Sequence, residues 1–224
     1  GFGDVYKRQT LDGIYNTVLV KDVLTHLSGK DVKTVQKIIR FLADNIANKS
    51  STNSITNTLY NEKSIASKNN ALVEEYLTAL EKSFIFYSAQ RYDIKGKEFL
   101  RSLEKYYMVD TGLRYFILGK VSDTGRILEN IVYFELLRKG YKVYIGKIED
   151  KEVDFIALKG EDKIYYQVSE LITNEDTRKR ELEALRDIGD SYPKVILTTD
   201  ILQTGTTEDG IKIISLTDWL LGDN

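Results

Sequence analysis

The sequence KEVDFIALKGEDKIYYQVS occupies residues 151–169 and contains two short apolar and aromatic runs separated by a polar turn. Such runs predict β-strands, here at Glu152–Leu158 and Lys163–Val168, with Gly160-Glu161-Asp162 as the tight turn between them. A further run, Lys142–Lys147, directly precedes them. The segment therefore predicts three consecutive strands of a sheet that helices must cover.

Helical patterns lie on both sides of these strands. Arg126–Arg138 is amphipathic at helical spacing, and Gly140 is its expected C-terminal cap. A charged helix is expected at Thr177–Asp187. The remaining expected elements are strands at Val195–Thr199 and Ile211–Ser215 and a closing helical turn at Leu216–Leu221. The order α-βββ-α-β-β predicts an α/β (α+β) fold with a mixed sheet flanked by helices.

The first half of the chain is predicted to be mainly helical. The expected helices are Tyr15–Leu27, one capped by Asp31, a short one that starts at Ser54, and one capped by Asn69 or Asn70 that runs through Leu80. Two strands, Ile85–Arg91 and Tyr106–Val109, follow and are separated by the polar stretch Asp93–Glu104. The last three of these helices, followed by the two strands, are typical of a winged helix.

Composition excludes several classes of site. The chain has 32 basic and 34 acidic residues, so nucleic-acid binding would require a local basic patch. It has no cysteine and a single histidine, His26, which excludes thiolate metal sites and mechanisms that need two imidazoles. No G-x-x-x-x-G-K-[ST] motif is present, so this stretch has no P-loop for ATP. Without a membrane-length apolar stretch or a signal peptide, the expected location is the cytoplasm.

Polar residues at three points of the second half form a recognisable layout. Glu129 lies on the expected helix, Asp154 on the second of the three strands, and Gln167 and Ser169 on one face of the third strand. This is the layout of the PD-(D/E)XK nuclease core, in which acidic groups hold Mg²⁺ and a lysine orients or activates water. Gln167 and Ser169 stand where that pattern expects Glu and Lys, so we expect an eroded site.

A replacement cation for this site is available on the next helix, from Arg178, Lys179 or Arg180. Each candidate also has a purely structural interpretation. Glu129 can cap or pair at an interface, Asp154 can be an edge-strand charge that faces water, and Gln167 can be an interior amide bonded to backbone. Mg²⁺ held by Glu129 and Asp154 is the only cofactor expected in this part of the protein.

The winged-helix region offers two charged surfaces. The expected recognition helix carries Glu74, Glu75 and Glu81, which disfavour the approach of phosphates. The basic residues of the expected wing are a weak candidate for nucleic-acid binding, and they are Lys95, Lys97, Arg101 and Lys105. Because charged runs of this size are usually solvated surface, packing or protein interaction is the preferred role of this domain.

Motifs along most of the chain resemble one family. They are GIYNTVLVKD at 13–22, RFLADN at 40–45, RYDIK at 91–95, EKYYMVD at 104–110, LENIVY at 128–133, EVDF at 152–155, YQV at 166–168 and YPK at 192–194. Together they resemble the C-terminal half of a group of prokaryotic AAA-type ATPases, a domain of unknown function with a winged helix and a PD-(D/E)XK-like fold. The resemblance implies an upstream ATP-binding domain, and it implies that Glu129, Asp154 and Gln167 are the nuclease-like positions.

The expected organisation follows from these patterns. Residues 1–9, with DVYKRQ at Asp4–Gln9, match a translated sequencing adapter, and we expect the natural chain to extend upstream of Thr10; a surface arm is the alternative. Residues 10–30 are expected to connect to the ATPase domain, residues 31–111 to form the winged helix, and residues 112–224 the nuclease-like domain.

The preferred hypothesis is a regulatory or partner-binding module of an AAA-type ATPase that lacks catalysis itself. Its expected partner is its own N-terminal ATPase domain, which alone would bind ATP, and DNA or another protein is the further partner left open. One alternative is a Mg²⁺-dependent DNA nuclease coupled to ATP hydrolysis. Another is a DNA-binding module that acts through the winged helix. No membrane partner is expected.

Overall fold

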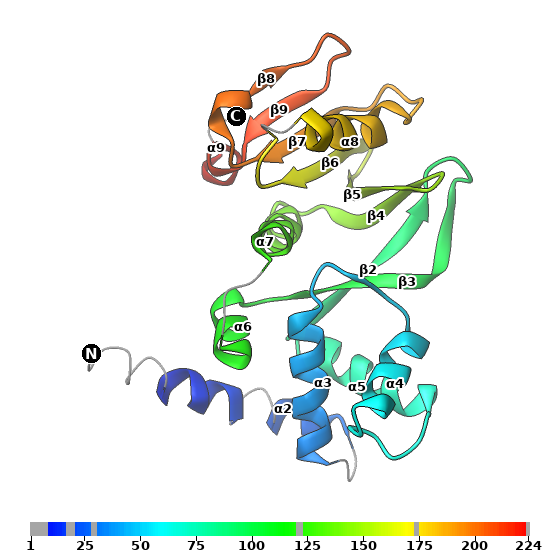
Figure 1. Cartoon of the computed structure of the whole chain (residues 1–224), viewed down its shortest axis with the longest axis vertical. Helices are drawn as coiled ribbons and strands as arrows, with labels where there is room; N and C mark the ends of the chain where they lie inside the picture. The colour runs from blue at the N-terminus through cyan, green and yellow to red at the C-terminus, as the bar shows by residue number, and fades with distance from the viewer. Residues whose placement is uncertain (1–8, 17–20, 28–30, 120–122, 173–174, 223–224) are drawn as a thin grey trace. The chain divides into compact units, whose positions relative to one another are not determined.

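The structure, a computed structural model, describes residues 9–16, 21–27, 31–119, 123–172 and 175–222 (Figure 1). The chain forms two compact units: unit 1 comprises Gly1–Ser88 and Glu104–Ser122, and unit 2 comprises Ala89–Leu103 and Asp123–Asn224. A hairpin of two strands contributes its base to unit 1 and its tip to unit 2. This division differs from the expected boundary after residue 111, because the chain stays in unit 1 for one more helix.

Unit 1 is built mainly from helices. Its elements are α2 (Lys21–Thr25), α3 (Val32–Asp44), β1 (Lys49–Ser50), α4 (Thr52–Asn61), α5 (Asn70–Lys82), α6 (Thr111–Leu118) and the base of the hairpin β2 (Phe86–Asp93) and β3 (Glu98–Met108). The long helix expected at Tyr15–Leu27 falls partly outside the described residues; of the described ones, Tyr15 and Asn16 are helical and Lys21–Thr25 form α2. Pairing of β1 with β3 is antiparallel, with Ser50 opposite Glu104.

Short polar side chains start the helices of unit 1. Asp31, Asn69 and Asp110 accept hydrogen bonds from main-chain N–H groups in the first turns of α3, α5 and α6. The predicted caps Asp31 and Asn69 are therefore confirmed. Helix α4 begins earlier than expected, because Ser51 and Ser54 form a capping box that fixes its start.

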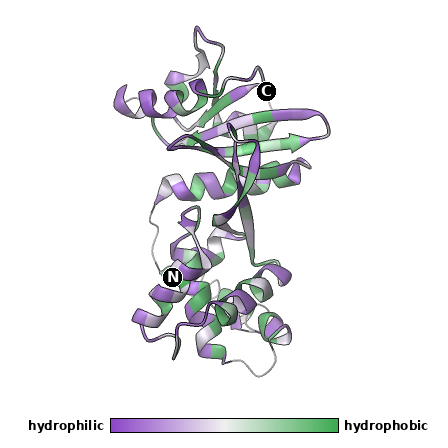
Figure 2. Ribbon diagram, turned by 90° about the vertical axis from the view of Figure 1, so that its right-hand side faces the viewer, coloured by the Kyte–Doolittle hydropathy of each residue, from purple (hydrophilic) through white to green (hydrophobic). Residues whose placement is uncertain are grey.

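The core of unit 1 is one apolar cluster, in which α3 packs on α6 and α5 packs on α4 and α2. Ile38, Ile39 and Leu42, at helical spacing on α3, have an exposed fraction of 1% or less. Figure 2 shows the corresponding bands of hydrophobic and hydrophilic residues along the helices. Arg114 of α6 is also buried, and its Nε donates a 2.7 Å hydrogen bond to the carbonyl of Ala43.

Unit 2 contains a mixed sheet and three helices among its described residues. Its elements, in addition to the hairpin tip, are α7 (Thr124–Arg138), β4 (Lys142–Ile148), β5 (Lys151–Lys159), β6 (Asp162–Ser169), α8 (Glu175–Arg186), β7 (Lys194–Thr198), a 3-10 turn η2 (Ile201–Gln203), β8 (Gly205–Thr206), β9 (Lys212–Ser215) and α9 (Leu216–Leu221). The strands of the described chain are hydrogen-bonded in the order β1-β3-β2-β4-β5-β6-β7-β9-β8. Strands β4, β5 and β6 are antiparallel neighbours, and β6, β7 and β9 run parallel. The predicted mixed α/β sheet is confirmed.

Helices α7 and α8 cover opposite faces of this sheet. The ring of Phe155 on β5 lies 6.1 Å from that of Tyr133 on α7. The next residue, Ile156, belongs instead to the apolar cluster that includes Leu182 and Leu185 of α8. Figure 1 shows the two helices on either side of the strands β4 to β7.

The longest elements that the patterns did not predict lie in two parts of the sequence. The polar stretch Asp93–Glu104 was expected to separate two strands, but most of it belongs to strand β3, whose outer residues are largely exposed. The second is helix α6, which follows the hairpin. Gly140 adopts a positive φ of 85° directly after Lys139 ends α7, as a C-terminal glycine does.

Candidate functional site

The strand that carries Asp154 is irregular at that residue. Tyr144 of β4 pairs with Ile156, whereas Gly146 pairs with Val153, and the register shifts between them. Ile145 therefore faces two residues, Asp154 and Phe155, which is the arrangement of a β-bulge. A bulge bends the strand and redirects its side chains, so this position is set by the sheet register rather than by simple alternation.

The side chains of Asp154 and Gln167 each accept a hydrogen bond from the main chain of the neighbouring strand. The last regular pair of β5 and β6 is Phe155 with Tyr166. Immediately beyond it, the main-chain N–H of Asp154 donates to Gln167 Oε1 at 3.2 Å. The N–H of Val168 donates to Asp154 Oδ2 at 2.9 Å. Two side chains thus replace backbone acceptors at the point where the regular ladder stops.

The other predicted positions are buried nearby in the fold. Glu129 lies on α7, which packs against β4, β5 and β6, and its exposed fraction is 8%. Gln167 and Ser169 have exposed fractions of 9% and 7%, and Asp154 has 8%. The structure brings Asp154 and Gln167 into direct contact and places Glu129 on a helix over the same strands. All four residues are largely shielded from solvent.

A divalent metal fits this arrangement poorly. Mg²⁺ prefers six oxygen ligands and usually keeps several waters, so its site must be open to solvent. Gln167 Oε1 already accepts a hydrogen bond from Asp154, and Asp154 Oδ2 accepts one from Val168. Within the part of the chain that the structure describes, no group of three or more His, Cys, Asp or Glu residues is placed to hold a metal ion.

The three candidate replacement cations on α8 have other partners. Arg178 Nη1 donates to Gln203 Oε1 at 2.7 Å. Lys179 lies 3.8 Å from a carboxylate oxygen of Glu183 on the same helix. Arg180 similarly bonds the neighbouring Glu181 at 2.9 Å. These contacts favour a structural role for the basic residues of α8.

The predicted basic patch of the wing is not one surface. Lys95 forms a 2.9 Å ion pair with Glu149, although both side chains are exposed. Lys97 and Arg101 are exposed on the hairpin tip in unit 2. Lys105 belongs to unit 1, and only 3% of it is exposed. The inclusion of Lys105 in an exposed nucleic-acid patch is therefore wrong, because its strand position turns it inward.

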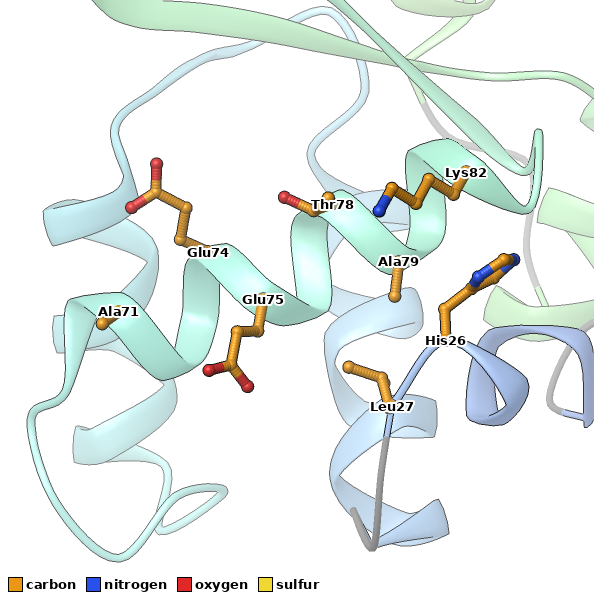
Figure 3. A pocket seen from close by; sticks show the side chains of 8 residues that line it. All are labelled: His26, Leu27, Ala71, Glu74, Glu75, Thr78, Ala79 and Lys82. Atoms are coloured by element: carbon orange, nitrogen blue, oxygen red, sulfur yellow. The ribbon is translucent and has the colours of Figure 1, made fainter.

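The acidic helix α5 lines a groove in unit 1. Figure 3 shows the helix beside His26 and Leu27, which follow α2, with Ala79 pointing toward them and Glu74 pointing away. The groove has a volume of about 680 Å³ and is lined by His26, Leu27, Ala71, Glu74, Glu75, Thr78, Ala79 and Lys82. Glu74 and Glu75, which the sequence places on the expected recognition helix, are among its lining residues together with Lys82.

A second acidic group adjoins α5. Burial raises the pKa of Glu104, and the negative charges of Glu81 and Glu74 raise it further. Tyr106, which bonds Glu104, has its pKa raised first by burial and then by the same carboxylates. Ionisation of Glu104 and of Tyr106 is therefore less favourable here than in water.

Replacing Glu104 by Gln is expected to stabilise unit 1 at pH 7. Because the folded pKa is raised, the contribution of this group to stability is present below the unfolded pKa and is lost as the pH rises through the folded pKa. The gain should be below about 1 kcal/mol, since the carboxyl is half exposed, and should vanish near pH 4. Circular dichroism melting at both pH values measures it, with Glu98→Gln on the exposed part of β3 as control. Equal gains at both pH values would contradict the explanation.

Comparison with known proteins identifies a family but no activity. Residues 4–124 match the family described as Domain of unknown function (DUF8612). An uncharacterized protein of Haemophilus influenzae is 40% identical over 216 residues, which cover 96% of this chain and 52% of that protein. An uncharacterized protein of Methanocaldococcus jannaschii is 29% identical over 181 residues, which cover 79% of this chain and 38% of that protein.

A solved structure, of a protein from Vibrio cholerae, is similar at a TM-score of 0.30 and 13% identity, covering 83% of this chain and 53% of that one. The chain thus spans about half the length of its Haemophilus relative. No helix among the described residues is long and apolar enough to cross a membrane. Because the family match covers more than half of the sequence, the chain belongs to the family of the Domain of unknown function (DUF8612).

Proposed function

We propose that this chain is a regulatory or partner-binding module of an AAA-type ATPase, in which unit 2 is a non-catalytic scaffold with a nuclease-like layout. The resemblance of the sequence motifs supports the link to an ATPase. The Haemophilus relative is about twice as long as the region it shares with this chain, which is enough for the additional ATP-binding domain.

The contact between Asp154 and Gln167 is the observation that carries the proposal. In a metal-dependent nuclease, carboxylate and carbonyl oxygens at these positions must be available to a cation and to the scissile phosphate. Here Gln167 Oε1 and Asp154 Oδ2 accept hydrogen bonds from the two strands that they join. Because these side-chain oxygens accept hydrogen bonds from main-chain N–H groups, they support a structural role for Asp154 and Gln167.

Burial of the nuclease-like positions supports the same proposal. Glu129, Asp154, Gln167 and Ser169 are each 7–9% exposed. A polyanionic substrate and the attacking water need an open approach to the catalytic groups, and the backbone of a nucleic acid cannot enter a site closed to this extent. Ser169 stands where the nuclease pattern has Lys, so this strand position carries no cation.

The surfaces of unit 1 favour a protein partner over DNA. The element order α3-β1-α4-α5-β2-β3 supports the winged-helix interpretation. Its helix α5, however, places Glu74 and Glu75 among the residues that line the groove with His26. Carboxylates repel the phosphate backbone and attract basic side chains, so a partner protein is the better electrostatic match.

The proposal is tested on the full-length Haemophilus relative. We expect it to hydrolyse ATP, and we expect deletion of the region that matches this chain to change the hydrolysis rate. Absence of ATP binding and hydrolysis in the full-length protein would overturn the assignment. A rate that is unchanged by the deletion would remove the regulatory role while leaving partner binding to be measured by affinity purification.

Incubation of this chain with single- and double-stranded DNA in Mg²⁺ or Mn²⁺ is expected to yield no cleavage above that of Asp154→Ala. The reason is the engagement of Asp154 and Gln167 by main-chain donors. Gel electrophoresis of end-labelled DNA measures this. Metal-dependent cleavage that disappears in Asp154→Ala would instead establish the nuclease alternative.

A further inference from the structure

An aromatic cluster lies on the β2–β3 hairpin and the adjacent strand β4. The ring centroid of Phe99 on β3 lies 5.1 Å from that of Tyr92 on β2 and 5.0 Å from that of Tyr144 on β4. Tyr92 and Tyr144 also pack on the apolar cluster that includes residues of α8. The three rings therefore lie on the α8 face of the sheet, and all of them belong to unit 2.

The outer ring of this aromatic cluster is open to solvent. Helix α8 packs on β5 and β6, which lie farther along the sheet than the hairpin. Phe99 is 48% exposed, whereas Tyr92 and Tyr144 beside it are half-buried. Because two neighbouring rings already restrict it, Phe99 offers an apolar ring that loses little conformational freedom when a ligand covers it.

Two basic side chains flank the aromatic cluster on the same face. Arg101 follows Phe99 by two residues on β3, and Lys142 precedes Tyr144 by two residues on β4. Side chains two residues apart on a strand point to one face, about 7 Å from each other. Both basic residues are exposed, and neither forms a hydrogen bond or an ion pair with any residue that the structure describes. Their charges are therefore available to an anion.

The acids near the hairpin tip do not neutralise these two cations. Three acids share a groove with the tip, and each has a basic partner at 2.6–3.2 Å: Glu149 with Lys95, Asp187 with Lys151 and Asp190 with Lys163. Glu98 directly precedes the outer ring on β3, so it points to the opposite face of that strand. This part of the α8 face thus combines an exposed ring with two unpaired positive charges.

A single-stranded nucleic acid matches this combination. It presents unstacked bases, which stack on aromatic side chains, and phosphates, which bond arginine and lysine. In a duplex, neighbouring base pairs cover the faces of the bases. An acidic peptide supplies negative charge but has no base to place on the ring.

We propose that the aromatic cluster binds single-stranded nucleic acid: a base stacks on Phe99, and phosphates bond Arg101 and Lys142. DNA and RNA share these groups, so both bind. The site is separate from the acidic groove of unit 1, which remains the surface for a protein partner. It goes beyond the proposed regulatory role and does not depend on the link to an ATPase.

Fluorescence anisotropy of a labelled oligothymidylate, titrated with the full chain at low salt, tests the role of the ring. Phe99→Leu is expected to weaken binding at least about fivefold, because leucine keeps an apolar contact but loses the stacking surface. Tyr115→Leu is the matched control, since Tyr115 is an exposed aromatic residue of α6 in unit 1, and it should bind like the wild type. Circular dichroism of each variant checks that the fold is retained.

Salt dependence tests the cations independently of the ring. For single strands, the logarithm of the binding constant falls with the logarithm of the salt concentration by about 0.7 per phosphate contact. Arg101→Gln and Lys142→Gln should each reduce this slope by about 0.7. Arg138→Gln removes the same charge from an exposed residue that is bonded to Glu135, and it should leave the slope unchanged.

Other ligands separate base stacking from charge alone. Oligothymidylate and oligouridylate are both expected to bind, and duplex DNA and poly-glutamate are expected to bind more weakly. The proposal would be overturned if the wild type bound neither single strand, if Phe99→Leu bound as tightly as Tyr115→Leu, or if poly-glutamate bound as tightly as the oligonucleotides. None of these results bears on ATP hydrolysis by the Haemophilus relative, so failure of this proposal and failure of the proposed function are distinguishable.

Discussion

Replacing Asp154 by alanine is expected to lower the free energy of unfolding of unit 2 by about 3 kcal/mol. The change removes a buried carboxylate that accepts a 2.9 Å hydrogen bond from Val168 and leaves that N–H without its acceptor. It also loosens the end of the ladder, where Gln167 bonds the N–H of Asp154. Bonds to a buried charged group are worth more than neutral ones, and an orphaned donor adds its own cost.

The sole tryptophan, Trp219, allows this effect to be measured in unit 2. It is 6% exposed and packs against Tyr166 on β6, so its fluorescence reports unfolding of the sheet. Urea titration should show a lower midpoint for Asp154→Ala with an unchanged slope. Asp162→Ala, an exposed position at the start of β6, should change the stability by less than about 0.5 kcal/mol. A similarly small effect for Asp154→Ala would refute the structural role.

The regular parts of the fold could be predicted because their sequences contain their own signals. Asp31 and Asn69 are short acceptors placed directly before apolar helical runs, and both cap helices. Strands β5 and β6 are bounded by the polar turn at 160–161 and have buried residues at their centres. In these segments local propensity and burial favour the same structure, which is why sequence alone sufficed.

Strand β3 and helix α6 could not be predicted in this way. Residues Glu98–Leu103 are mostly exposed, so they have no alternating apolar face, and their strand conformation depends on pairing in the sheet. Helix α6 is short and buries Arg114, a residue type that normally indicates surface. Its burial is tolerated because Ala43 supplies a main-chain acceptor 71 residues away in the sequence. Contacts of this range leave no local signal.

The neighbourhood of Asp154 and Gln167 was predictable from the sequence, but their hydrogen bonds were not. Asp154 and Gln167 were placed on neighbouring strands from the spacing of two runs, and the structure brings them together. The hydrogen bonds that these two side chains accept from main-chain N–H groups depend on the bulge opposite Ile145, which arises from cross-strand register.

Gly146→Ala is expected to destabilise unit 2 by about 2–3 kcal/mol. Gly146 lies in β4 between Tyr92 on β2 and Val153 on β5. A Cβ added at this glycine would lie 2.9 Å from Val153 Cβ, 3.2 Å from the Val153 carbonyl oxygen and 3.1 Å from Ile94 Cδ1. Two of these atoms belong to, or are fixed directly on, the neighbouring backbone, so a side-chain rotation cannot relieve the overlap.

The expected response is an outward shift of β5 at the residue that precedes Asp154, and urea unfolding followed by Trp219 fluorescence measures its cost. Gly125→Ala is the matched control, since a Cβ at that position in α7 meets nothing within 4 Å. Alanine there should be neutral or stabilising by up to about 1 kcal/mol, because glycine weakens a helix. If Gly146→Ala proved as stable as Gly125→Ala, β4 and β5 would have to lie farther apart than the bulged register allows, and the geometry that directs Asp154 toward Val168 would be wrong.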